Sequence, residues 1–262
     1  MGESNGMKIE AKRCTLLDVA EMREEFSQAA GCQIVRYSNL SRGFAYAVLL
    51  TLDGQPVGYG SVRTTDDEDR IIEFYVREAY KDLANELALR LISSTKVKLF
   101  EVQTNLRWAA DLLPLLGQEI EVGPTLFCPN EENHLKLSQG LFRKRLPADQ
   151  IFAHQHEPEG DWMVDIGGQV VATGGYLSHY NPPFVDLYME VEPSFRRQGI
   201  GSYLIQEMQK VCRASGLTPG ARCDASNLAS SRCLQRGGMR ICGQLLTVRL
   251  GPIRNLDRPR NG

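Results

Sequence analysis

The stretch Val191-Glu-Pro-Ser-Phe-Arg-Arg-Gln-Gly-Ile-Gly-Ser202 lies where a predicted strand gives way to a predicted helix. Residues 184–191 alternate between apolar and polar side chains, which is the period of a strand with one buried face. From 200 to 212 the apolar side chains recur at helical spacing, and Gly216 is a helix stop signal. A strand that runs directly into a helix is typical of α/β proteins, so this junction sets the frame for the rest of the sequence.

Short predicted elements flank the junction on both sides. Residues 161–166 and 169–176 are predicted strands around a Gly167-Gly168 turn, which indicates a hairpin. After the long helix we expect a strand at 220–225, a short helix at 228–236 and a last strand at 244–250. This order predicts an α/β fold with a mixed sheet, in the α+β sense that its strands run both ways.

Two glycines mark the start of the long helix, at Gly199 and Gly201. A helix start offers unpaired N–H groups and the positive end of the helix dipole, and glycine lets an anion approach the backbone. Arg196 and Arg197 add two cations beside it. The junction therefore predicts an anion-binding turn, with the alternative that the glycines only ease a tight turn.

Two well-known phosphate loops fit these residues poorly. A P-loop requires Gly-Lys-Ser/Thr at the helix start, whereas Gly201 is followed by Ser202 and Tyr203. The dinucleotide fingerprint requires a third glycine three residues after the second, and that position is Leu204.

The loop closely resembles the acetyl-coenzyme A loop of the GNAT superfamily of N-acyltransferases, whose pattern is Arg/Gln-x-x-Gly-x-Gly/Ala. Arg196, Gly199 and Gly201 fill its fixed positions, and residues 189–193 match the strand that leads into it. Downstream, Asn227 followed by residues 234–239 is similar to the family's second cofactor motif. The resemblance covers about the last hundred residues.

The resemblance implies a set of site residues for acetyl-CoA. It implies that backbone amides between residues 197 and 202 bind the diphosphate, that the strand edge at Met189 and Val191 pairs with the pantetheine arm, and that Asn227 contacts this arm. The implied cofactor-binding residues are Met189, Val191, Arg196, Arg197, Gln198, Gly199, Ile200, Gly201, Ser202 and Asn227. A strand edge beside a helix start suits a ligand with two amides and a diphosphate.

The sequence offers a candidate general base but no clear general acid. We expect direct transfer with Glu190 as general base, and Glu192 and Tyr188 as weaker candidates; the alternative for Glu190 is a solvated carboxylate on an outer strand face. Many family members have a tyrosine acid where this chain has Leu234, so we leave the acid unassigned. Tyr188 and His179, the latter in a loop before the strand, are expected at the acceptor side.

The first half of the chain resembles a degenerate repeat of the second. Residues 53–60 align with 167–174 at an offset of 114, residues 76–81 with 191–196 at 115, and residues 104–106 with 226–228 at 122. In this frame Ala84 and Glu86 replace the two loop glycines, and a carboxylate there would repel a diphosphate. We therefore expect Gly201→Glu to abolish cofactor binding and leave the fold intact.

This pattern is similar to tandem GNAT proteins with one degenerate domain; chance similarity of two α/β segments is the alternative. We expect a disordered N-terminus at 1–6, a degenerate domain at 7–127 with a helix at 16–30, a linker at 128–149 and an acetyl-CoA-binding domain at 150–262. The implied function is an acetyl-CoA-dependent N-acetyltransferase for a primary amine of a small molecule or peptide. The alternatives are a non-catalytic acyl-CoA-binding sensor and a structural protein without coenzyme A binding.

Composition limits the partners. Thirty Lys and Arg against 32 Asp and Glu give a net charge of -2, which disfavours nucleic acid. Seven scattered cysteines without a Cys-x-x-Cys pair predict free thiols, no metal and a cytoplasmic protein. No apolar run reaches the ~18 residues of a membrane span, so we expect no membrane partner and a monomer or homodimer. Acidic residues near the acceptor side, Glu157, Glu159, Asp161, Asp165, Asp186 and Glu190, favour a cationic amine or simply form a solvated acidic face.

Overall fold

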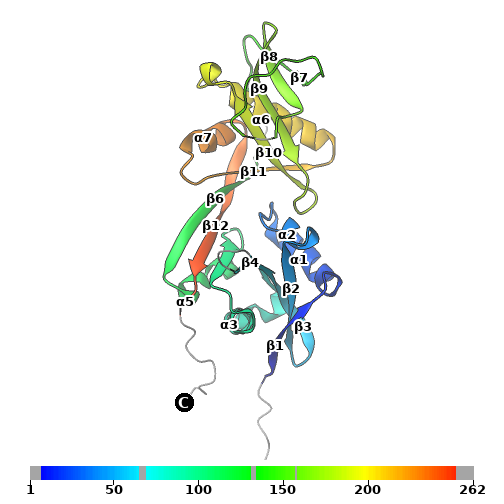
Figure 1. Ribbon diagram of the computed structural model, residues 1–262, viewed down its shortest axis with the longest axis vertical. Helices are drawn as coiled ribbons and strands as arrows, with labels where there is room; N and C mark the ends of the chain where they lie inside the picture. Colours follow the sequence, from blue (N-terminus) through cyan, green and yellow to red (C-terminus); the bar gives the residue numbers. More distant parts are fainter. Residues whose placement is uncertain (1–6, 65–68, 131–133, 157, 252–262) are drawn as a thin grey trace, which may run out of the picture. The chain divides into compact units, whose positions relative to one another are not determined.

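A computed structural model describes residues 7–64, 69–130, 134–156 and 158–251 (Figure 1). The expected disordered segment 1–6 lies outside the described residues. The chain forms two compact units, one containing residues up to Gly123 together with those from Gln244, and the other running from Pro124 to Gly243. The chain passes from the first unit to the second within strand β6 (Glu119–Pro129) and returns within β12 (Met239–Arg249).

These bounds differ from the expected domains because two long strands take part in distant pairings. The end of β12 pairs antiparallel with β5 (Leu99–Gln103), which assigns residues from 244 onward to the first unit. Residues 125–127 of β6 pair with β11 (Thr218–Cys223), which assigns them to the second unit. The expected linker also contains strand β7 (Leu141–Lys144), which pairs with β8 (Trp162–Ile166).

The first unit is an α/β layer with strand order β1-β2-β3-β4-β5-β12. Its other elements are β1 (Ile9–Cys14), a 3-10 turn (Leu17–Val19), α1 (Ala20–Ala30), α2 (Ser38–Ser41), β2 (Ala45–Leu52), β3 (Gln55–Arg63), β4 (Arg70–Val76), a 3-10 turn (Glu78–Leu83), α3 (Ala84–Thr95), α4 (Arg107–Ala110) and α5 (Leu113–Leu116). The 3-10 turn and α1 occupy the range predicted for the first helix. Phe26 of α1 packs on Tyr59 and Tyr75, with ring centroids 6.3 and 5.6 Å apart.

The second unit has strand order β6-β11-β10-β9-β8-β7. Its further elements are β9 (Gln169–Leu177), β10 (Phe184–Val191), a 3-10 turn (Pro193–Phe195), α6 (Ile200–Ala214) and α7 (Leu228–Arg236). The predicted hairpin is confirmed, because β8 and β9 pair around Gly167 and Gly168, whose φ angles of 60° and 86° suit only glycine well. The mixed α/β class is confirmed too, with β10 parallel to β11 and antiparallel to β9.

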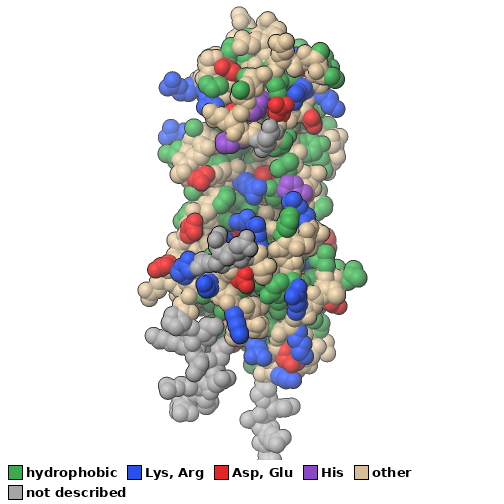
Figure 2. Space-filling view, viewed as in Figure 1, with side chains coloured by type: hydrophobic (Ala, Val, Ile, Leu, Met, Phe, Trp, Pro, Cys, Tyr) green, Lys and Arg blue, Asp and Glu red, His purple; other side chains and the backbone are tan. Residues whose placement is uncertain are grey.

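The core of the second unit lies between α6 and the sheet. Leu187 is buried in it, and Met189 and Val191 pack against it, so the apolar face of β10 points toward the helix as its alternation predicted. Tyr188 and Glu190 therefore belong to the opposite face of the strand. Figure 2 shows acidic and basic side chains interspersed on the face in view, as the small net charge suggests.

No helix in the described ranges is both long enough and apolar enough to cross a membrane.

Candidate active site

A cleft opens in the second unit where β10 and β11 separate. Their parallel register ends at Leu187 and Ala221, although β10 continues to Val191 and β11 to Cys223. The end of β10 thus has a strand partner only on its β9 side within the described pairings. The cleft has a volume of about 610 Å³, which is within the usual range for small-molecule sites. Its lining combines this strand edge, the loop before α6, and one side of α7.

The loop before α6 lines the cleft and has an unusual backbone. Arg197 and Gly199 have positive φ angles of 63° and 83°, and the first helical hydrogen bond runs from Tyr203 N–H to the Gly199 carbonyl at 3.0 Å. Within the described part of the chain, no protein group accepts a hydrogen bond from the backbone amides of residues 197–202. Because α6 is 15 residues long, these amides lie at the positive end of a full helix dipole.

The two loop glycines have different roles. A Cβ at Gly199 would meet nothing within 4 Å, so this residue is required for its positive φ and leaves the backbone open. A Cβ at Gly201 would lie 2.9 Å from Cys233 Sγ and 3.2 Å from Met189 Cε. Gly201 therefore allows α6 to pack closely on α7 and β10. This corrects the expectation that Gly201→Glu would leave the fold intact, since a charged side chain would have to enter a packed contact.

Cations surround the loop. Arg196 and Arg197 line the cleft as expected, and Arg196 donates from Nε to the Val191 carbonyl at 2.9 Å. Two further arginines, Arg232 and Arg236, line it from α7 and were missed from the sequence. They lie four residues apart, which is one helical turn, on the helix that follows Asn227, and this spacing is a signal that could have found them.

Asn227 lies at the cleft and also caps α7. Its side-chain oxygen accepts from Ser230 N–H at 3.0 Å. A bond from this side chain to a ligand would therefore come from its amide nitrogen. The other cofactor residues implied by the resemblance also line the cleft, namely Met189, Val191, Gly199, Ile200, Gly201 and Ser202, whereas Gln198 does not line it and bonds to the Ser194 carbonyl at 3.4 Å.

Glu190 is held by the protein itself rather than by solvent. Gln155 N–H donates to both carboxylate oxygens at 3.1 Å, and His156 N–H donates to one of them at 3.3 Å. A guanidinium nitrogen of Arg196 lies 3.8 Å from the carboxylate, and the Glu190 side chain is 12% exposed. Gln155 and His156 line the cleft beside Glu190, and neither was assigned to it from the sequence.

The other acid–base candidates are less well placed. Tyr188 does not line the cleft, and burial together with the nearby Asp161 raises its pKa. His179 stacks on Tyr180 at 4.4 Å and is outside the cleft lining. Leu234 is 4% exposed and belongs to the core, while Cys233 lines the cleft with a pKa raised by burial. The thiol is thus protonated at neutral pH.

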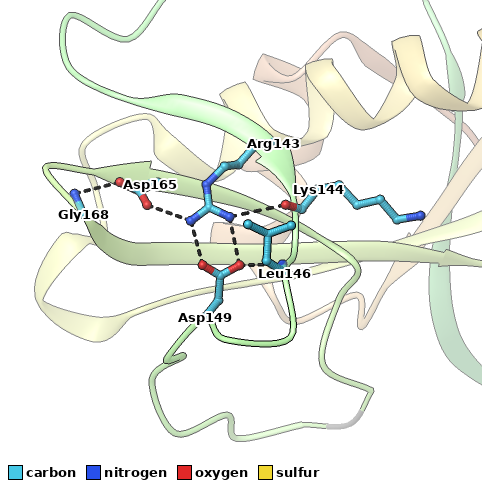
Figure 3. A network of polar contacts seen from close by, with 6 residues as sticks. All are labelled: Arg143, Lys144, Leu146, Asp149, Asp165 and Gly168. Carbon is cyan, nitrogen blue, oxygen red and sulfur yellow. Dashed lines mark hydrogen bonds and ion pairs between the residues drawn. The ribbon is translucent and has the colours of Figure 1, made fainter.

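Most acids counted near the acceptor side are already paired with arginines. Glu159 pairs with Arg145 at 2.8 Å and Asp186 with Arg222 at 3.1 Å. Figure 3 shows Arg143 bridging Asp149 and Asp165, at 2.8 and 2.9 Å. Glu157 lies outside the described residues. These pairs neutralise much of the acidic face, so they remove support for a preference for cationic amines.

The corresponding region of the first unit is closed. Its parallel strands β4 and β5 pair only at Arg70–Leu99 and Ile71–Phe100, so they separate as β10 and β11 do. Phe74, which matches Met189 at the offset of 115, is buried between Phe100 and Trp108, with centroids 5.4 and 5.8 Å away. A cavity lined in part by Phe74 holds about 20 Å³, room for about one water molecule. Aromatic packing thus replaces the cleft in this copy.

Comparisons with known proteins agree with a cleft in the second unit and a closed region at the matching place in the first. The model of the acetyltransferase (GNAT) family matches residues 128–239. Among solved structures, a GNAT-family acetyltransferase from Colwellia psychrerythraea is similar over 93% of this chain and 100% of its own, with a TM-score of 0.67 and 17% identity. A GCN5-related N-acetyltransferase from Sphaerobacter thermophilus covers 95% of this chain and 98% of its own, with a TM-score of 0.58 and 15% identity.

A tandem GNAT protein from the clavulanic acid biosynthesis pathway covers 94% of this chain and 100% of its own, with a TM-score of 0.55 and 9% identity. A search of curated proteins finds no match. At these identities the solved structures establish the fold, and the family model establishes membership for the half that carries the cleft. Residues 128–239 therefore belong to the acetyltransferase (GNAT) family, and the chain as a whole has the tandem GNAT fold.

Proposed function

We propose that the chain is an acetyl-CoA-dependent N-acetyltransferase, acting in the cytoplasm as a monomer or homodimer on a primary amine of a small molecule or peptide. The observation that carries this proposal is the α6 start: among the described residues, no group accepts from the backbone amides of residues 197–202, and all of these residues except Gln198 line the cleft beside the end of β10. The first unit, whose matching region is filled by aromatic rings, is assigned no cofactor.

The residues present fit coenzyme A. Its diphosphate would be held by the amides of the α6 start and by Arg196 and Arg197, and the α7 arginines Arg232 and Arg236 line the same cleft. Its amide-bearing arm would lie along the end of β10, near Met189, and Asn227 would donate to it. Bound acetyl-CoA would supply a thioester, which is the activated acyl group of the reaction.

Transfer to an amine requires a neutral nucleophile and a leaving thiolate that the site tolerates. A thiol with an ordinary pKa of about 8.5 is a good leaving group, so the burial of Leu234 in place of a family acid is compatible with turnover. A general base near Met189 must still accept the proton of the amine. The hydrogen bonds that Glu190 accepts from Gln155 and His156 help to decide which residue is this base.

A second candidate function is an acyl-CoA-binding sensor without turnover. The observation that favours it is Leu234, a buried apolar side chain at the position where many family members have a tyrosine acid.

The test is to incubate the full chain with acetyl-CoA and a panel of small amines, amino acids and peptides, and to measure free thiol release and acetylated product. Transfer to at least one amine supports the enzyme. Coenzyme A binding by calorimetry without any transfer supports the sensor, and absence of binding contradicts both.

A further inference from the structure

A loop in the second unit occupies the place that a helix takes in the first. Tyr59 and Tyr75, on which α1 packs through Phe26, match Thr173 and Glu190 at the offsets of 114 and 115. In the second unit these two positions face the segment 154–156 instead. His154 Nε2 lies 2.5 Å from Thr173 Oγ1, and the next two amides donate to Glu190.

We propose that Glu190 is a positioning residue that holds Gln155 and His156 at the rim of the cleft, and that the imidazole of His156 accepts the proton of the attacking amine. This rests on the proposed function, since it names the base of the same site. It assigns to Glu190 a role other than the general base expected from the sequence.

The carboxylate geometry supports positioning rather than proton transfer. Both Glu190 oxygens already accept backbone N–H bonds, and Arg196 lies on the same carboxylate at 3.8 Å. A general base must keep a lone pair directed at the substrate, whereas a carboxylate that accepts several amides is used as an anchor.

The rest of the loop is anchored on both sides of this contact. Before it, Arg143 holds Asp149 and Asp165, and Asp149 also accepts from Leu146 N–H at 2.6 Å (Figure 3). After it, Arg145 N–H donates to the Asp161 carbonyl at 2.8 Å. Between these ends, His154 is held by Thr173, and the contacts with Glu190 are the hydrogen bonds that fix the amides of residues 155 and 156.

His156 has the chemistry that the site otherwise lacks. It lines the cleft together with Met189, whose strand edge would hold the thioester. The charged and titratable groups that share this lining are Glu190, Arg196, Arg197, Arg232, Cys233 and Arg236. The arginines carry no free lone pair, the Glu190 carboxylate already accepts backbone N–H bonds, and the Cys233 thiol is protonated. The imidazole of His156 is therefore the side chain in this lining that is best suited to accept a proton.

The proton balance closes without another reactant. As the amine nitrogen bonds to the acyl carbon and the carbon–sulfur bond breaks, one amine proton passes to a ring nitrogen of neutral His156. The departing thiolate takes up that proton from the imidazolium, directly or relayed through water, so that coenzyme A leaves as thiol and the imidazole is restored.

Two measurements on the full chain separate the roles. In amide hydrogen exchange without ligand, Glu190→Ala should raise the exchange of residues 155 and 156 about tenfold, and Glu190→Gln, which keeps one acceptor oxygen, should raise it less. With acetyl-CoA and the best amine of the panel, His156→Gln should lower kcat about 100-fold and remove the acidic limb of its pH profile, with exchange unchanged. His134→Gln, an exposed histidine outside the cleft, is the control.

Unchanged exchange in folded Glu190→Gln and Glu190→Ala would overturn the positioning role. An unchanged kcat and acidic limb in His156→Gln, or loss of that limb in Glu190→Gln with intact amide protection, would overturn His156 as the base. If the wild-type chain transfers acetyl to no amine, the proposed function fails and the base assignment with it, while hydrogen exchange still decides the role of Glu190.

Discussion

Replacing Gly199 by glutamate tests the anion site at the point where the backbone is most open. Gly199 lines the cleft at the start of α6, and a Cβ at this position would meet nothing within 4 Å. The new side chain therefore has room without displacing the core. Its carboxylate would lie beside the same amides that are to receive the diphosphate.

The expected loss of affinity follows from charge. Two unit charges about 4 Å apart interact by about 1 kcal/mol in water and about 4 kcal/mol at an effective dielectric of about 20. Against a ligand group with two negative charges, the carboxylate should cost at least about 2 kcal/mol, which is about 30-fold in Kd. The φ of 83° adds strain of about 1–2 kcal/mol, which lowers stability in any non-glycine variant.

Matched variants separate charge from strain. Gly199→Gln has nearly the same shape and strain without the charge, so it should bind coenzyme A far better than Gly199→Glu. Gly216→Glu places the same residue at the other end of α6, where φ is 72° and a Cβ also meets nothing within 4 Å. Calorimetric titration with coenzyme A gives Kd, and thermal unfolding gives stability. If Gly199→Glu and Gly199→Gln bind within threefold of each other, the diphosphate assignment is wrong.

Three further outcomes follow from packing and burial. Gly201→Ala should destabilise the fold by about 1–3 kcal/mol in denaturant unfolding, because its Cβ would lie 2.9 Å from Cys233 Sγ, and adding Cys233→Ala should restore part of the loss; equal single and double variants would refute this contact. Burial raises the pKa of Glu73 to about 7, against about 4.3 for a free carboxyl, so the native state favours the protonated form. Stability should therefore fall as pH rises from about 4 to 7, and Glu73→Gln should flatten this dependence; a wild-type stability that rises over that window would contradict it. Burial also raises the pKa of Cys233, so iodoacetamide should alkylate it slowly at pH 7 and more slowly with coenzyme A bound; rapid labelling would indicate an accessible thiolate.

Local patterns predicted much of the second unit from the sequence. The alternation of residues 184–191, the helical spacing after 200 and the Gly-Gly hairpin each depend on near neighbours, and the structure has all three. The loop proposed to bind the cofactor could be singled out for the same reason, since its residues are consecutive.

Long-range contacts were not predictable in this way. The exchange of β6 and β12 between the units depends on pairings such as Leu245 with Gln103, which leave no local period in the sequence. The environment of Glu190 is set by amides 34 and 35 residues away, in a segment without helical or strand periodicity. A strand pattern fixes which face a side chain takes, and it cannot show what covers that face.

The most direct test of the central claim is an NMR titration of the nitrogen-15-labelled chain with acetyl-CoA, with assigned backbone amides. We expect the amides of residues 197–202 and of Met189 to show the largest shifts, and those of residues 77–86 in the first unit to stay unchanged. Shifts centred on residues 77–86, or none at 197–202 with saturating ligand, would contradict it.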